Sequence, residues 1–379
     1  FRVRKFMKLF KSLLVAPATL GLLAPMTATA NEITINDFNP VVEETLLAGG
    51  EGLVDSYDGG FSETTSASFS VDFAIGAVDG TGIGTASGLS TTDGDEALEA
   101  YYGFQIDLST SFTGEDSLDI SLDAGNGGGS AGEFDLNSTT DALTVDGVSY
   151  TFPLGEKVTA FVGDNTDGSL LFSTACVYGG PSNTLDDCGA ASAPLGAGEF
   201  ATGASLDIGN GFTAAVGYTG AGGSTSGLLT KEGDDSYAGQ LTYTADTYGA
   251  SVTYALIEAS AVDTTFWAVN GYWTPSDSGS VPSISAGYEV GNPETAGAKD
   301  TTQYFVGLQW DEAGPGTFGV ALGTDGAFAE DATEYMMYEA FYSYPVNDSM
   351  TITPLVYVKE NDATKEDQTG ILVKTSFSF

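Results

Sequence analysis

The stretch ILVKTSFSF, residues 371–379, is the most informative part of this 379-residue chain for its fold. One face of the predicted strand carries mainly apolar and aromatic side chains: Ile371, Val373, Thr375, Phe377 and Phe379. The other face is mostly polar: Leu372, Lys374, Ser376 and Ser378. One face therefore suits lipid and the other suits water, and a final aromatic residue is typical of bacterial outer-membrane β-barrels. Because a soluble β-sandwich can end on such a strand too, the rest of the chain must decide between them.

Residues 1–30 read as a secretory signal. An apolar stretch runs from Leu13 to Met26, and small residues at 28–30 form the expected cleavage site. Met7 reads as the initiator, with residues 1–6 as an upstream extension. The basic residues expected before the apolar stretch are Arg2, Arg4, Lys5, Lys8 and Lys11. We therefore expect an exported protein.

Membrane crossing by helices is not indicated. No later run reaches the roughly 18 consecutive apolar residues that a spanning helix needs. Only helices and closed barrels satisfy their backbone hydrogen bonds in lipid. If the exported chain spans a membrane, it must do so as a barrel.

The charge balance excludes one class of partner. Beyond the signal the chain has no arginine and no histidine, and its few lysines face 52 Asp and Glu residues. Such a chain cannot neutralise phosphates, so nucleic acid is excluded as a partner. An acidic load can mark disorder. Here an apolar content of 42%, an aromatic content of 11% and 51 glycines favour many strands and turns instead.

Alternating segments recur from about residue 67 to the end. We count about sixteen predicted strands, separated in turn by short and long polar connectors. Short turns on one side and long loops on the other, with an even strand number, are typical of a single-chain outer-membrane barrel. The prediction is an all-β transmembrane antiparallel barrel over residues 67–379, preceded by a periplasmic arm at 31–66.

Four phrases of this barrel resemble the carbohydrate-selective porin family of cyanobacterial outer membranes: Gln303–Trp310, Asp107–Asp116, Ile352–Pro354 and Val373–Phe377. The resemblance covers roughly residues 61–379. It implies a sixteen-stranded homotrimer in the outer-membrane lipid that passively conducts small hydrophilic solutes, such as carbohydrates and inorganic ions. Larger members carry an amino-terminal surface-layer-homology domain, for which the segment 31–66 has no room.

Cys176 and Cys188 are the only cysteines, and in an exported chain a disulfide between them is the default expectation. They lie in the long connector at 165–199. In sixteen-stranded porins the third long loop narrows the lumen, and this connector is the third. We therefore expect a stiffened constriction loop, although a plain surface staple remains an alternative. The acidic residues in or beside the loop are Asp164, Asp167, Asp186, Asp187 and Glu199.

Strand alternation also predicts which charges face the lumen. Lys374 is the only lysine on the lumen-facing side of a mid-length strand. The predicted lumen carboxylates are Asp72, Asp107, Asp119, Asp123 and Glu289. A pore that rejects cations needs rings of Arg or Lys. The chain therefore favours cations and neutral solutes over anions.

Catalysis is poorly supported. Without histidine no nucleophile–base constellation of the usual kind can be assembled. Two thiols and no histidine do not favour a metal site, and no cofactor is indicated. The rival hypothesis from another class is a secreted, acidic, calcium-stabilised adhesin or surface-layer protein built of sandwiches.

Overall fold

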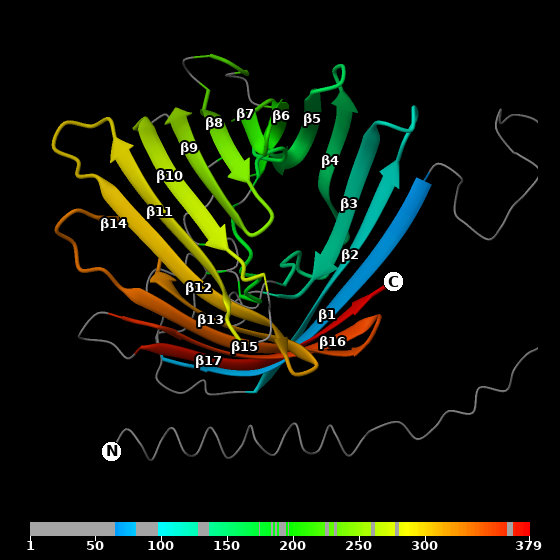
Figure 1. Cartoon of the computed structure of the whole chain (residues 1–379), viewed down its shortest axis with the longest axis vertical. Helices are drawn as coiled ribbons and strands as arrows, with labels where there is room; N and C mark the ends of the chain where they lie inside the picture. The colour runs from blue at the N-terminus through cyan, green and yellow to red at the C-terminus, as the bar shows by residue number, and fades with distance from the viewer. Residues whose placement is uncertain are drawn as a thin grey trace, which may run out of the picture. The chain divides into compact units, whose positions relative to one another are not determined.

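The alternation at the end of the chain continues around a closed sheet. In the computed structural model, sixteen long antiparallel strands pair in chain order and β17 (Gln368–Ser378) pairs back to β1 (Thr65–Asp79) (Figure 1). The structure describes residues 65–80, 98–127, 136–173, 175–182, 185, 188, 195, 197–223, 227–230, 233–258, 262–276, 280–361 and 367–379. The predicted signal and nearly all of the predicted arm lie outside these residues. No helix within them is long and apolar enough to cross a membrane.

The remaining elements are β2 (Glu99–Thr110), β3 (Ser117–Gly125), β4 (Thr144–Pro153), β5 (Val158–Asp167), β6 (Ala197–Gly209), β7 (Phe212–Gly220), β8 (Asp235–Thr244), β9 (Tyr248–Glu258), β10 (Thr264–Trp273), β11 (Ser283–Pro293), β12 (Thr301–Ala313), β13 (Gly316–Thr324), β14 (Phe328–Ala329), β15 (Met336–Asn347) and β16 (Met350–Lys359). The short β14 pairs only with the start of β12, so β13 pairs directly with β15. The predicted all-β barrel is confirmed, and it begins at residue 65 rather than 67.

The final strand closes the barrel. Phe377 lies opposite Val71 in the β1–β17 register. Beyond it, Phe379 and Phe69 exchange two backbone hydrogen bonds of 3.0 and 2.9 Å, and their rings stack with centroids 5.7 Å apart. The chain end is thus both the seam of the sheet and part of its apolar outer face.

The two rims of the barrel differ. One rim has mostly tight turns, among them the Gly209-Asn210-Gly211 hairpin, where positive φ at all three residues suits the Asn-Gly signal. The opposite rim carries the longer connectors. These are 80–98, 126–143, 168–196, 221–234, 294–300, 325–335 and 360–367, with a short one at 259–263. This asymmetry follows the sequence pattern.

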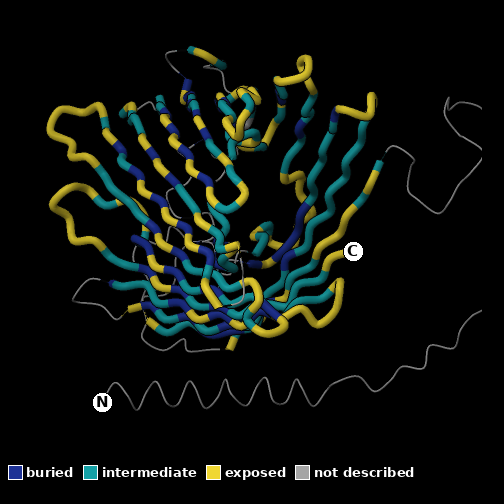
Figure 2. Tube along the Cα trace, in the orientation of Figure 1, coloured by how far each residue is buried: buried dark blue, intermediate teal, exposed yellow. Residues whose placement is uncertain are grey.

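Burial alternates along the strands in the sense opposite to that of a soluble protein (Figure 2). In β9, Val252 and Tyr254 are about 40% exposed on the outer face, whereas Thr253 and Ala255 are fully buried on the inner face. An outer belt of exposed apolar side chains suits lipid. The closed sheet with this pattern overturns the stacked sandwiches of the rival hypothesis.

Candidate functional site

The described residues of the connector between β5 and β6 (168–196) lie inside the barrel. Three of its backbone N–H groups donate hydrogen bonds to wall side chains: Ser173 to Gln240 Oε1 (2.8 Å), Val177 to Ser285 Oγ (3.0 Å) and Gly179 to Gln309 Oε1 (2.9 Å). The acceptors belong to β8, β11 and β12. Because strands far apart around the barrel hold one loop, the loop must run along the inner wall. We call residues 168–196 the inner loop.

Tyr178 anchors the inner loop to β15. Its hydroxyl donates a 2.7 Å hydrogen bond to Glu339 Oε1, and both residues are almost fully buried. Its ring packs against Phe305 at 5.4 Å and Phe341 at 5.8 Å. Burial, and then the Glu339 carboxyl, raise the pKa of the Tyr178 hydroxyl. The hydroxyl therefore stays protonated and remains a donor.

A disulfide joins Cys176 to Cys188, with 6.3 Å between the Cα atoms. Cys188 and Leu185 are fully buried in an apolar cluster that also includes inner-wall residues of β13, β15, β16 and β17. The wall makes space for the loop with glycine. A Cβ on Gly307 would lie 2.7 Å from the Tyr178 ring, and one on Gly323 would lie 2.9 Å from Leu185 Cδ2. Loop and wall are therefore complementary in both polar and apolar contacts.

The loop contacts identify the inner face of every strand. Glu339 lies opposite Tyr357 and Tyr357 opposite Gly370, so alternation along β17 turns Lys374 inward. Lys374 in turn lies opposite Ala74 of β1 and Thr353 of β16. The same register places Asp72, Asp107, Asp119 and Asp123 on the inner face. The polar face predicted for the last strand is thus its lumen side.

The predicted lumen carboxylates fall into two groups. Asp72, Asp107 and Asp119 are half-buried, and Asp107 Oδ1 accepts from Ser121 Oγ (2.7 Å). Asp123 and Glu289 are instead buried. Glu289 lies on the distant strand β11, where its Oε1 accepts from the side-chain amide of Gln303 (2.9 Å). The structure therefore brings Asp107, Asp119 and Asp123 together on β2 and β3 and leaves Glu289 apart.

The acidic residues predicted for the constriction loop are scattered. Asp164 lies within β5 opposite Val148, exposed on the outer face, because β5 continues to Asp167 instead of ending before residue 165. Asp167 ends that strand, and Glu199 lies within β6. Asp186 and Asp187 lie outside the described residues. Asn165 has a positive φ of 52°, but the β5–β6 pairing keeps one register on both sides of it, with Asp164 opposite Phe200 and Thr166 opposite Gly198.

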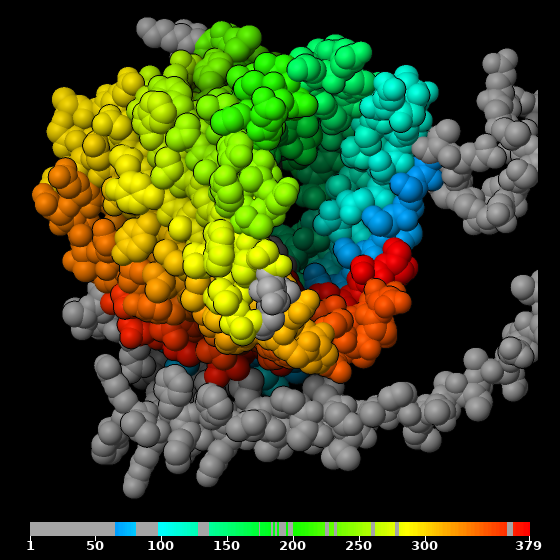
Figure 3. Space-filling model, in the orientation of Figure 1, coloured from blue at the N-terminus to red at the C-terminus, as the bar shows by residue number. Residues whose placement is uncertain are grey.

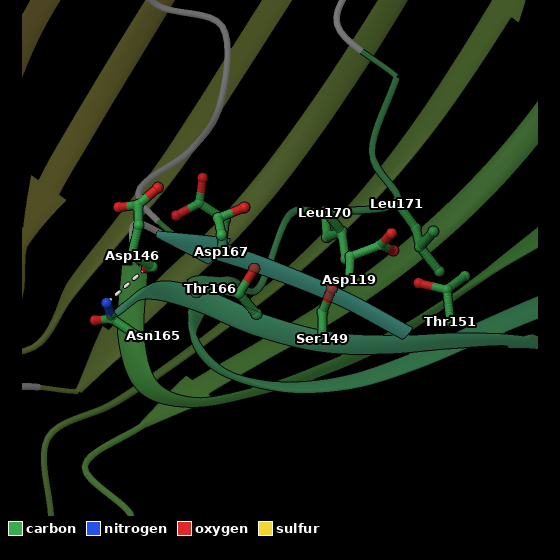
Figure 4. Close-up of a pocket in the computed structure, with 11 residues that line it drawn as sticks. Asp119, Asp146, Ser149, Thr151, Asn165, Thr166, Asp167, Leu170 and Leu171 are labelled. Carbon is green, nitrogen blue, oxygen red and sulfur yellow. Dashed lines mark hydrogen bonds between the residues drawn. The ribbon is translucent and has the colours of Figure 1, made fainter. Parts of the chain in front are cut away.

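A pocket of about 520 Å³ opens on the inner side of β3, β4 and β5 at the start of the inner loop (Figure 4). Three carboxylates line it, Asp119, Asp146 and Asp167, together with hydroxyl groups and the loop residues Leu170 and Leu171. The side-chain amide of Asn165 donates to the backbone carbonyl of Asp146 (2.6 Å), the residue that the β3–β4 pairing skips. The pocket is therefore a polar, acidic recess of the interior.

Sequence reasoning missed the anchors of the inner loop. Gln240, Ser285, Gln309 and Glu339 stand at inner-face positions, where any polar residue fits the alternation equally well. Tyr178 carried no signal beyond its place between the cysteines. Within the described residues, no group of three or more Asp, Glu, Cys or His side chains is arranged to hold a metal ion.

Comparison with known proteins adds information on the fold. No protein-family model and no curated protein matches the sequence. Solved outer-membrane porins do match in structure. The high-pH structure of Pseudomonas putida OprB has a TM-score of 0.57 at 10% identity over 83% of this chain and 94% of its own. An anion-selective porin from Comamonas acidovorans has a TM-score of 0.56 at 14% identity, over 83% and 99%. A mutant Rh. blastica porin has a TM-score of 0.54 at 13% identity, over 83% and 100%. The chain thus has the porin fold.

Proposed function

We propose that this protein is an outer-membrane channel through which small hydrophilic solutes diffuse, without covalent chemistry or a cofactor. The supporting observation is the one-sided docking of the inner loop. Its described residues are hydrogen-bonded to β8, β11, β12 and β15, while the space-filling surface is hollowed beside β2 and β3 (Figure 3). In this proposal the loop narrows the lumen and the hollow is the solute path.

The charges along this path favour cations and neutral solutes. Asp72, Asp107 and Asp119 face the interior, against Lys374 on β17. A second inner-face lysine, Lys359, forms an ion pair with Asp325 (3.1 Å) at the rim of the long loops. Rings of charged side chains set ion selectivity in pores. Dissolved salt screens the field of such charges over a distance of about 10 Å at 0.1 M. The preference should therefore be strongest at low salt.

The test is the reversal potential of the purified protein in a planar bilayer under a KCl gradient. We expect a cation-to-anion permeability ratio above one. The double variant Asp107→Asn, Asp119→Asn should lower it. Asp164→Asn is the matched control because it removes the same charge from the outer face of β5, and it should leave the ratio unchanged. An anion preference of the native protein would refute the electrostatic part of the proposal.

The inner-face aromatic residues differ in exposure. Phe305, Phe341 and Tyr357 point inward but are at most 4% exposed, because they pack in the cluster that holds the inner loop. Tyr101 and Tyr272 also lie on the inner face, and they are partly exposed. The proposal therefore keeps both carbohydrates and inorganic ions among the solutes. Liposome swelling with sugars and amino acids of graded size tests which of them pass.

Several finer points belong to the same proposal. Export follows from the signal pattern at 1–30, whereas residence in the outer membrane, assembly as a homotrimer and kinship with the cyanobacterial carbohydrate-selective porins follow from the sequence resemblance. The porin fold is consistent with each of them. Heat-modifiable migration in gels and cross-linking of the detergent-purified protein would test the barrel and its oligomeric state.

A further inference from the structure

A buried carboxylate on the outer side of the barrel wall has one oxygen without a hydrogen-bond partner. Asp235, the first residue of β8, is 1% exposed. Its Oδ1 accepts a 2.5 Å hydrogen bond from the Tyr218 hydroxyl, but its Oδ2 is buried without a hydrogen-bond partner. Alternation in β8 turns Asp235 outward, together with Tyr237 and Leu241, whereas Gln240 contacts the inner loop. Asp235 therefore lies apart from the proposed solute path.

A buried anion in this state is costly. Removing an ionised carboxylate from water is strongly unfavourable unless hydrogen bonds or an opposite charge compensate it. One oxygen of Asp235 has such compensation from Tyr218, and the other has none. Either a cation completes the environment of this oxygen, or the carboxyl group stays neutral. The two cases can be told apart.

Other oxygen atoms converge beside Oδ2. A Cβ built on Gly233 would lie 2.8 Å from the Gly227 carbonyl oxygen, 3.3 Å from Thr230 Oγ1 and 3.6 Å from Asp235 Oδ2. Three oxygens of different chemical type thus lie within 4 Å of one position beside the Gly233 Cα. The loop is held in this shape by a 3.1 Å hydrogen bond from the Gly233 N–H to the Thr230 carbonyl. Its attachment to Tyr218 is a 3.3 Å bond from the Leu229 N–H to the hydroxyl.

A second carboxylate lies next to the first. Glu258 is directly opposite Asp235 in the β8–β9 register. Side chains that face each other across two antiparallel strands have Cβ atoms about 4.5–5.5 Å apart. Two like charges at this separation repel, which adds to the demand for a cation. Carboxylate, carbonyl and hydroxyl oxygens are the ligands that Ca²⁺ takes in proteins.

We propose that Asp235, Glu258, Thr230 and the Gly227 carbonyl form a calcium site where β8 and β9 meet the connector 221–234. Two carboxylates, one carbonyl and one hydroxyl provide fewer than the 6–8 ligands that Ca²⁺ takes, and water completes the set. The ion would tie the connector to the rim of the barrel. This inference does not depend on channel activity.

Terbium luminescence tests the site directly, because Tb³⁺ substitutes for Ca²⁺ and is excited by nearby tyrosines. Tyr218 donates to Asp235, and the Tyr237 ring lies 5.3 Å from the Tyr218 ring. In the detergent-purified barrel we expect tyrosine-sensitised emission that added Ca²⁺ displaces. Asp235→Asn should weaken binding at least about tenfold, since even altered outer-shell partners cost metal sites 10–100-fold.

Asp246→Asn is the matched control. It removes an exposed carboxylate from the turn between β8 and β9, which also has tyrosines beside it, Tyr243 and Tyr248. This variant should keep the displaceable emission. If Asp235→Asn does not fold, Glu258→Gln and Gly233→Ala decide instead. The first removes a ligand, and the second places a methyl group 2.8 Å from the Gly227 carbonyl oxygen, so both should weaken binding.

Thermal unfolding gives an independent result. Ca²⁺ should raise the unfolding temperature of the native barrel relative to chelator, and it should have a clearly smaller effect on Asp235→Asn. A neutral Asp235 predicts the opposite pattern: no calcium-dependent shift, no displaceable emission, and Asp235→Asn as stable as the native protein. That pattern would overturn the proposal.

Discussion

Tyr178→Phe isolates the hydrogen bond that ties the inner loop to β15. The ring and its contacts with Phe305 and Phe341 remain, and only the 2.7 Å bond to Glu339 Oε1 is lost. Removing the donor to a buried acceptor costs about 1–3 kcal/mol. Because about 1.4 kcal/mol is a tenfold change in an equilibrium constant, the population with the loop detached should rise roughly 5- to 150-fold. The barrel strands themselves are untouched.

Single-channel recording measures this population. We expect more frequent excursions to higher conductance in Tyr178→Phe, with unchanged heat-modifiable migration of the barrel. Tyr254→Phe is the control, since Tyr254 lies on the outer face against Trp267, with ring centroids 4.9 Å apart. Current traces of Tyr178→Phe that match those of the native protein would refute the role of this bond in holding the loop.

Two further perturbations test other parts of the structure. Replacing Cys176 and Cys188 with serine removes a cross-link that stabilises the fold by about 2–4 kcal/mol. The conductance should therefore fluctuate more in bilayer recordings, while the barrel still resists detergent at room temperature. Current noise equal to that of the native protein would contradict this. Asp116 lies in the turn before β3. Hydrogen bonds from the Tyr150 hydroxyl, and then from the backbone and side chain of Thr113, lower the pKa of its carboxyl below the ordinary value of 3.8. Because the pKa of Asp116 is lower in the folded state, its ionised carboxyl stabilises the fold above pH 3.8. This stabilisation is lost as the pH falls from 3.8 through the folded-state pKa. Asp116→Asn should therefore be less stable than the native protein at pH 7, with the gap closing in acid; a gap that does not change with pH would count against this interpretation.

The fold could be predicted because the alternation of apolar and polar residues within a single barrel strand shows which face meets lipid and which meets the lumen. In the last strand, Phe377 and Lys374 are assigned to opposite faces by the two-residue period alone, and closure onto β1 needs no further information. The tight turns could be predicted as well, since Asn210 and Gly211 are residue types that readily adopt the positive φ that the hairpin requires. These signals act over a few residues, which is the range that sequence patterns cover.

The interior could be predicted only in part. The inner loop was located by its length and its cysteines, but its partners are 67 to 161 residues away in the chain. Gln309 and Glu339 look like any water-facing polar residues until the loop is placed against them. Asp164 shows the converse limit, since it belongs to the outer face of β5 and not to the loop. Long-range contacts and bulges have no local signature.

The most direct test of the proposed solute path compares two variants, each with one cysteine introduced on the inner wall. The native cysteines are joined to each other, so an introduced one is the only free thiol. Ser121→Cys lies on β3 beside Asp107, and Ser285→Cys lies on β11 beneath the inner loop. We expect a bulky, water-soluble thiol reagent to reduce the conductance of Ser121→Cys and to leave Ser285→Cys unchanged. Block at Ser285→Cys with no effect at Ser121→Cys would show that the solute path runs on the other side of the lumen.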